Sequence, residues 1–246
     1  MGKTMVRFFA IGAGLLLFMG GMGAGAGAGR GAGAGSMENP VHALEQRYHH
    51  AGTLKAIFFE SYSDGNGGVS AESGTVYFSR PGRMRWDYES PEQKLFLVDG
   101  TNVWFYVPSD HTASRAKLSQ STDWRTPLAL LAGKADLSKL CRTIETIDAK
   151  APALKPGDVH AAPGDTVLRC IPRESPESET IREVLFEIDA QAFLTRVVIG
   201  ETGNVTTEFR FGNWEENLPI PEAEFHFQAP PGVAIVDEEA LAGSIH

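Results

Sequence analysis

The sequence predicts a mainly β (α+β) fold, in which about ten or eleven antiparallel strands form one curled sheet with few, short helices. Short runs that alternate apolar and polar residues recur along the chain, as in half-buried strands. Clusters of Gly, Pro, Asp and Asn separate these runs at hairpin spacing. Two segments, residues 39–51 and 126–133, have helical patterns instead. Because a sheet this large must curl, apolar helices are expected to fill its hollow face.

The expected strands of the first half carry large aromatic side chains. Met84, Trp86 and Tyr88 alternate with Arg85 and Asp87, which predicts a strand with one apolar face. The glycine-rich run at residues 64–68 predicts a hairpin tip. Other strands are expected at residues 53–62, 74–80, 94–99, 102–107 and 114–118. This region is typical of the wall of a hydrophobic container.

The two helices have recognisable ends. Asn39 is a good N-cap with Pro40 behind it, and Thr126 and Pro127 repeat that arrangement. The second helix ends before Gly133 and is apolar nearly all round, so it is expected to be buried. Strands then resume at residues 142–148, 166–172, 182–189, 193–200, 205–212 and 223–228.

The first 36 residues differ from the rest of the chain. Lys3 and Arg7 precede a short apolar run, and a Gly/Ala-rich stretch follows, which is the layout of a secretory signal peptide and leader. An uncleaved inner-membrane anchor is the alternative. Residues 37–246 are expected to form a single domain. The leader holds three of the 22 Lys and Arg residues and none of the 31 Asp and Glu residues. Residues 37–246 therefore have 19 basic and 31 acidic residues, and their formal net charge is −12. This charge argues against nucleic acid as a partner.

The chain has two cysteines, Cys141 and Cys170. Both fall in expected strands, and a hairpin that turns near residue 156 would bring them roughly opposite each other. In an oxidising compartment they would be able to form a disulfide. Two buried free thiols are the alternative, because cysteine is also a common small core residue. The sequence leaves both possibilities open.

Sequence motifs for catalysis are missing. The seven histidines are scattered, and the adjacent His49 and His50 would point about 100° apart on a helix, which suits no shared metal ion. No nucleophile elbow, zinc-protease motif, phosphate-binding loop or Cys-x-x-Cys motif occurs. We therefore expect a protein that is not an enzyme and has no cofactor and no metal site.

A series of motifs resembles the periplasmic outer-membrane lipoprotein carrier (LolA) family, from about residue 40 to residue 236. Each motif is short, and the specificity lies in their order and spacing. They are Arg80-Pro81-Gly82, Met84-Arg85-Trp86, Tyr88, Pro91, Leu97-Val98-Asp99-Gly100, Val103-Trp104, Tyr106, Pro108, Thr126-Pro127, Asp189, Gly203-Asn204, Phe209, Phe211, Asn217, Pro221, Phe225, Phe227 and Pro230-Pro231-Gly232-Val233.

The resemblance implies an unclosed antiparallel β-barrel with a lid of short α-helices over a hydrophobic cavity. Proteins of this family carry acylated lipoproteins across the periplasm, from an inner-membrane lipoprotein-releasing ABC transporter to an outer-membrane lipoprotein receptor. The resemblance thus implies a periplasmic chaperone, and we expect a monomer.

The same resemblance suggests roles for particular residues. Arg80 matches an arginine that hydrogen-bonds the lid helices in the family, so it is expected to be a lid latch. Met84 stands where an aromatic residue is usual, but it is also apolar. The two cysteines and the Gly/Ala leader are not expected of the family. The residues expected to line the acyl-chain cavity and lid are Met84, Trp86, Trp104, Tyr106, Leu128 and Leu131.

Two other functions remain open at this point. The same fold would suit a carrier of another lipid or glycolipid, or a non-catalytic module that senses lipoproteins. The related outer-membrane receptor is normally lipid-anchored through a cysteine, and no cysteine lies directly after the apolar run of this chain.

Overall fold

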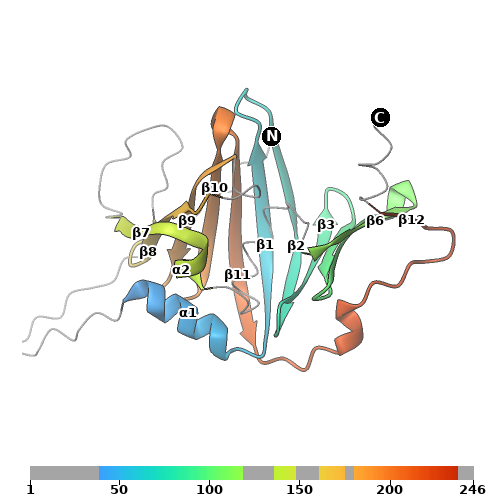
Figure 1. The fold of residues 1–246 in the computed structure, drawn as a ribbon, viewed down its shortest axis with the longest axis horizontal. Coiled ribbons are helices and arrows are strands. Elements are labelled where there is room, and N and C mark those ends of the chain that lie inside the picture. Colours follow the sequence, from blue (N-terminus) through green and yellow to red (C-terminus); the bar gives the residue numbers. More distant parts are fainter. Residues whose placement is uncertain (1–38, 119–135, 148–160, 175–179, 238–246) are drawn as a thin grey trace, which may run out of the picture. The chain divides into compact units, whose positions relative to one another are not determined.

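The computed structural model describes residues 39–118, 136–147, 161–174 and 180–237, all of which belong to one compact unit, residues 37–246. The unit is built on a single sheet of twelve strands (Figure 1). In chain order the strands are β1 Thr53–Ser63, β2 Val69–Ser79, β3 Arg83–Ser90, β4 Lys94–Val98, β5 Asn102–Val107, β6 Thr112–Lys117, β7 Cys141–Ile147, β8 Thr166–Pro172, β9 Ile181–Ile188, β10 Leu194–Glu201, β11 Thr206–Glu216 and β12 Ala234–Asp237.

The strand order across the sheet is β12-β6-β5-β4-β3-β2-β1-β11-β10-β9-β8-β7. Neighbouring strands are antiparallel except for β12 and β6, which run parallel. The outermost strands, β12 and β7, do not pair with each other, so the sheet is unclosed. The predicted fold class is confirmed, with slightly more strands than the ten or eleven expected.

The prediction of the last strand is wrong. Residues 223–228 were expected to be extended, but Glu222–Phe225 form a short 3₁₀ helix, η6, and the final strand is β12. Pro219 and Pro221 precede this segment, and a proline cannot donate a hydrogen bond to a neighbouring strand. The alternation of Phe225 and Phe227 therefore reflects packing onto the sheet from outside, rather than membership of it.

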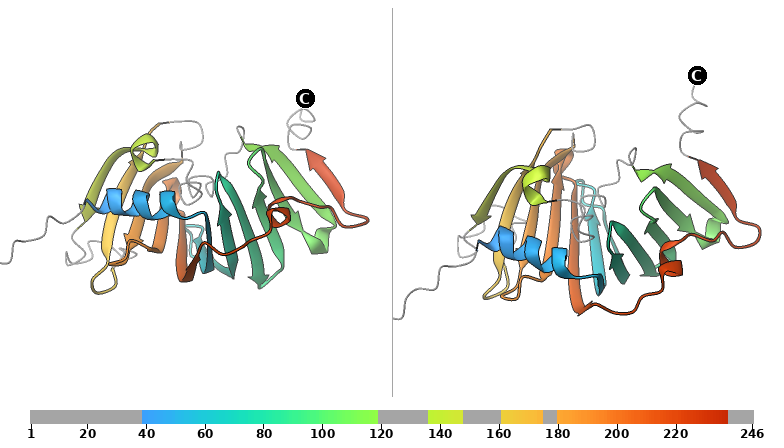
Figure 2. Two further views of the ribbon diagram at one scale, coloured as in Figure 1. Left: turned by 90° about the horizontal axis from the view of Figure 1, so that it is seen from below. Right: turned by 60° about the horizontal axis from the view of Figure 1, so that its bottom comes forward.

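Two described helices lie against the sheet. The predicted N-terminal helix is confirmed as α1, Pro40–His50, and the Asn39 side chain accepts a hydrogen bond of 3.0 Å from the Val41 N–H. Figure 2 shows α1 running across one face of the sheet. The helix α2 is a single turn, Leu137–Leu140. The helix expected at residues 126–133 lies outside the described residues.

We call the face of the sheet that packs against α1 the inner face, and the opposite face the outer face. Leu44 and Tyr48 of α1 are fully buried there, and the Tyr48 hydroxyl accepts a hydrogen bond of 2.8 Å from the Leu194 N–H. Burial raises the pKa of the Tyr48 phenol far above its ordinary value, so this group stays protonated. The helix is thus held to the sheet by apolar packing and by one buried hydrogen bond.

The chain after β11 covers part of the outer face. Phe225 of η6 is buried against Leu97 and Trp104, and the Phe227 ring stacks on Trp104 with centroids 4.9 Å apart. The segment ends in β12, where the Asp237 carboxylate accepts hydrogen bonds of 2.6 and 2.9 Å from the Arg115 guanidinium. This second, smaller apolar cluster fixes the C-terminal segment to strands β4 to β6.

We predict that Phe225→Ala lowers the free energy of unfolding by about 3–5 kcal/mol, because it leaves a cavity in the outer cluster. Phe225 is 1% exposed, whereas Phe59 on the same face is 46% exposed. Phe59→Ala is therefore the matched control and should change stability by less than about 1 kcal/mol. Urea denaturation of both variants tests this, and equal losses would contradict the assignment of Phe225 as the buried contact.

Candidate functional site

Aromatic side chains from both halves of the chain meet on the inner face. Trp86 lies at their centre and is fully buried, with its ring centroid 4.8 Å from that of Phe58 and 5.5 Å from that of Phe209. Phe78 and Phe211 complete its surroundings at 6.2 and 6.1 Å. Strand alternation explains this gathering, because every second residue of β1, β2, β3 and β11 points to the same face. The inner face is therefore an extended apolar surface.

The predicted residues Met84 and Trp86 both belong to this surface. Met84 pairs with Phe78 on β2 and Val98 on β4, and it is 0% exposed. A flexible thioether thus fills this position of the inner face.

Trp104 and Tyr106, which were expected to line the acyl-chain cavity or lid, lie on the outer face, opposite the face that holds Met84 and Trp86. The register pairs Leu97 with Trp104 and Leu95 with Tyr106, and both pairs pack against Phe227 and its neighbours. The residue of β5 that packs against the inner cluster is Phe105. Sequence reasoning missed it because β5 is apolar on both faces, so alternation alone did not choose between them.

A hydrogen bond fixes Trp104 on the outer face. Its indole N–H donates to the Asp99 carboxylate at 3.0 Å. Burial alone would raise the pKa of Asp99, but the N–H donors of Asn102, Trp104 and Thr101 together lower it. Arg85 is half-buried on this face and pairs with Asp87 and Glu224 at 2.9 and 3.1 Å.

Arg80 lies just after β2, at the start of the turn to β3. Its N–H donates a hydrogen bond of 3.1 Å to the Gly52 carbonyl, and its side chain is half-buried. Within the described part of the chain, the Arg80 side chain makes no hydrogen bond or ion pair. Leu128 and Leu131 lie outside the described residues, so the latch and its proposed lid contacts remain predictions.

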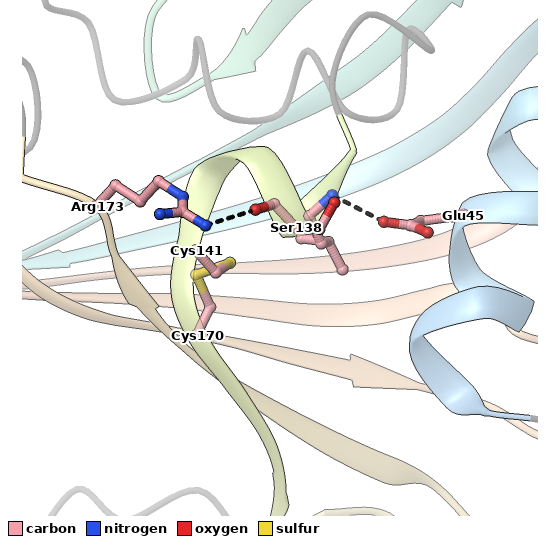
Figure 3. Close-up of a disulfide and its surroundings, with 6 residues drawn as sticks. Glu45, Ser138, Cys141, Cys170 and Arg173 are labelled. Atoms are coloured by element: carbon pink, nitrogen blue, oxygen red, sulfur yellow. Dashed lines mark hydrogen bonds between the residues drawn. A yellow bond between two sulfur atoms is a disulfide. The ribbon is translucent and has the colours of Figure 1, made fainter.

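The two cysteines are bonded to each other in the structure (Figure 3). Cys141 is the first residue of the edge strand β7, and Cys170 lies on the neighbouring strand β8. Because Cys141 directly follows α2, the disulfide joins the end of this helix to the sheet.

Hydrogen bonds hold α2 at both ends. Its first N–H, that of Leu137, donates to the Glu45 carboxylate of α1 at 2.8 Å. The Arg173 guanidinium donates to the Ser138 carbonyl at 3.2 Å (Figure 3). The Arg173 N–H donates to the Leu140 carbonyl at 2.9 Å. These contacts satisfy groups that a one-turn helix would otherwise leave unpaired.

A groove of about 830 Å³ runs beside α1 and does not suit an acyl chain. Its lining is largely polar and includes His42, His50 and Glu216, and Arg47 forms a 3.1 Å ion pair with Glu216 across it.

Among the described residues, no group of three or more His, Cys, Asp or Glu side chains is placed to hold a metal ion. In the same residues, every helix is too short or too polar to cross a membrane.

Comparison with known proteins places the chain in a family. The family model described as outer membrane lipoprotein carrier protein LolA matches residues 49–228. The chain belongs to this family. A relative from Dechloromonas aromatica, an outer-membrane lipoprotein carrier protein, is 31% identical over 189 residues, which cover 76% of this chain and 82% of the relative. Another from Nitrosospira multiformis, with the same description, is 29% identical over 80% of this chain and 87% of its own length.

Solved structures that match this LolA family member have lower sequence identity to it than the two relatives above. A LolA superfamily protein from Nitrosomonas europaea is 12% identical, with a TM-score of 0.44 over 76% of this chain and 96% of its own. A conserved protein from Thermus thermophilus is 11% identical, with a TM-score of 0.48 over 80% of this chain and 96% of its own.

We predict that reduction of the Cys141–Cys170 disulfide lowers the free energy of unfolding by about 3 kcal/mol, because it removes a cross-link between residues 29 positions apart. Urea denaturation with and without dithiothreitol measures the loss. The Cys141→Ala/Cys170→Ala double variant is the control, since its midpoint should not respond to the reductant. A wild-type midpoint that is insensitive to reduction would contradict a stabilising disulfide.

Proposed function

We propose that this protein is a periplasmic carrier that binds the acyl chains of lipoproteins against its inner face. It receives them from an inner-membrane lipoprotein-releasing ABC transporter and delivers them to an outer-membrane lipoprotein receptor. The observation that carries the proposal is the aromatic surface around Trp86, in a chain that belongs to a family of lipoprotein carriers. The relatives named as outer-membrane lipoprotein carrier proteins support lipoproteins as the class of cargo.

The energetics of acyl burial favour an apolar surface of this kind. Burial of one methylene group contributes about 0.8 kcal/mol, so one long acyl chain contributes on the order of 10 kcal/mol. Two or three chains would make release very slow unless binding also broke contacts within the protein. A carrier therefore needs an empty state with stabilising contacts that are lost when cargo enters.

Arg80 is our proposed source of such contacts. A guanidinium has five N–H donors and is able to satisfy several carbonyl groups at the end of a helix. We propose that Arg80 holds the lid segment that contains Leu128 and Leu131 over the inner face of the empty protein. Opening would break these hydrogen bonds and offset part of the free energy of acyl burial, so that cargo is able to leave.

Residues 1–36 would direct export, because their charged start, apolar run and small residues are the features of a signal peptide. We propose that they are a signal peptide and leader, and that residues 37–246 act as the carrier domain in the periplasm. A disulfide between Cys141 and Cys170 is consistent with that compartment, where cysteines are kept oxidised.

We predict that the mature domain binds a triacylated peptide at a one-to-one ratio and does not bind the same peptide without acyl chains. The reason is that most of the binding free energy comes from burial of the acyl chains against the apolar inner face, and the peptide without acyl chains lacks this contribution. Native mass spectrometry of each mixture measures this. A folded domain that binds neither peptide would contradict the proposal and leave the aromatic surface as ordinary core. Preference for a glycolipid over the lipopeptide would favour a carrier of other lipids.

We predict that Arg80→Leu binds the lipopeptide more tightly and transfers it more slowly to an acceptor, because the empty state loses its latch. The loss of two or three hydrogen bonds made by a charged donor corresponds to about tenfold or more in affinity. Arg83→Leu is the matched control, since Arg83 pairs with Glu222 on the outer face at 2.7 Å. Unchanged transfer to an outer-membrane receptor by Arg80→Leu would rule out the latch.

A further inference from the structure

A row of polar side chains interrupts the apolar inner face. Four neighbouring strands each contribute one residue, and we call Glu60, Glu72, Tyr88 and Lys94 the polar row. The register places Glu60 opposite Glu72, and Tyr88 opposite Lys94. The next residues of these strands on the same face, toward the aromatic cluster, are Phe58, Gly74, Trp86 and Phe96. The polar row therefore borders the aromatic cluster on the side of the β1–β2 hairpin tip.

The side chains of the polar row reach across intervening strands. The Tyr88 hydroxyl donates a hydrogen bond of 2.8 Å to the Glu60 carboxylate, so the phenol of β3 reaches β1 across β2. Gly74 lies between them and has no side chain, and a Cβ there would lie 1.9 Å from the Asp87 carbonyl oxygen. The Lys94 ammonium group similarly crosses β3 to pair with Glu72 of β2.

Stability alone does not account for this row. Glu60 is 9% exposed, and removing a carboxylate from water costs free energy even when it is hydrogen-bonded. Apolar residues of similar size in place of buried polar pairs are often neutral or stabilising. Polar groups kept in an otherwise apolar surface are therefore expected where a ligand needs them.

A second, independent feature lies beside the row. Trp86 is 0% exposed, and its indole N–H has no hydrogen-bond partner among the described residues. A buried donor without an acceptor costs about 1–3 kcal/mol. Trp86 and Tyr88 are two residues apart on one strand and one face, so this unpaired donor and the polar row belong to the same part of the inner face. The Trp86 N–H is therefore suited to donate a hydrogen bond to an acceptor that belongs to a ligand.

We infer that the polar row and the Trp86 N–H bind the polar head of an acylated peptide, where ester carbonyls and the first main-chain amides join the acyl chains to the polypeptide. The Trp86 N–H and the Lys94 ammonium group donate to ester carbonyls, and the Glu60 and Glu72 carboxylates accept from amide N–H groups. This inference rests on the proposed function and adds where the head of the cargo lies.

The acyl chains would then run from the polar row along the aromatic surface toward α1. From Glu60 to Leu54 the inner face of β1 extends about 20 Å, and Phe58, Ala56 and Leu54 are its buried residues on that path. The head is thus fixed at one end of an apolar surface, and the polypeptide leaves at the side of the β1–β2 hairpin tip. This arrangement distinguishes a lipopeptide from an apolar molecule without such a head.

The test compares two ligands on matched variants. Fluorescence titrations measure the binding of a tripalmitoyl-Cys-Ser peptide and of diphenylhexatriene, an apolar probe with no polar head. Glu60→Gln removes the charge but keeps an acceptor for Tyr88, and Trp86→Phe removes the N–H but keeps an apolar ring. Glu215→Gln, on the outer face of β11, is the control. We expect each of the first two variants to bind the lipopeptide about five- to tenfold more weakly and to lose clearly less affinity for diphenylhexatriene, whereas Glu215→Gln binds both ligands as wild type does.

An ether-linked analogue of the same peptide tests the carbonyl contact directly, because it lacks the ester carbonyls. We expect wild type to bind it more weakly than the ester, and Trp86→Phe to cause no further loss. Wild-type affinity for the ester peptide in both variants, or an equal loss of both ligands, would overturn the inference. If wild type bound diphenylhexatriene but no lipopeptide, the proposed function itself would fail, and this inference with it.

Discussion

The pairing of β1 with β11 is the contact on which the rest of the structure depends. It joins a meander of strands before residue 118 to another after residue 136, and without it the sheet would separate into two halves. Its register places Phe58 opposite Phe211, and Glu60 opposite Phe209, so aromatic residues from both halves meet around Trp86. Since the paired strands are about 150 residues apart, closing this contact carries a large entropic cost during folding.

The two faces of the sheet meet different physical demands. On the outer face, the C-terminal segment covers Leu97 and Trp104 with Phe225, while Ile57 and Phe59 of β1 stay exposed. On the inner face, α1 covers one part of the apolar surface, and the disulfide and Arg173 fix α2 near the sheet edge. The inner face thus holds the larger apolar cluster, and the C-terminal segment, the disulfide and the α2 contacts add stability away from the aromatic residues around Trp86.

Much of the fold was predictable from sequence, because strand alternation and turn residues are local signals. The strands around Met84 and Trp86, the hairpin at residues 64–68 and the Asn39-capped helix are examples. The face of β5 was not predictable, since both of its faces are apolar and alternation does not distinguish Trp104 from Phe105. The segment at residues 223–228 was wrongly predicted to be a strand, because apolar and polar residues also alternate in a chain segment that packs onto the surface of a sheet.

The candidate site was only partly predictable. Met84 and Trp86 followed from alternation within one strand, but the polar row did not, because its four residues come from four strands and meet only through register. Glu60 breaks the apolar pattern of Leu54, Ala56 and Phe58, and this was the one local signal available. Whether Cys141 and Cys170 pair was equally undecided, since it depends on the register of β7 against β8.

The central claim is that acyl chains lie on the inner face, and methyl NMR with a nitroxide-labelled acyl peptide tests it most directly. Met84 and Ile199 are inner-face probes that are almost fully buried, and Ile57, 50% exposed on the outer face, is the reference. The account predicts that the bound label broadens the Met84 and Ile199 methyl signals and leaves that of Ile57 unchanged. Broadening of Ile57 with Met84 unaffected would contradict it.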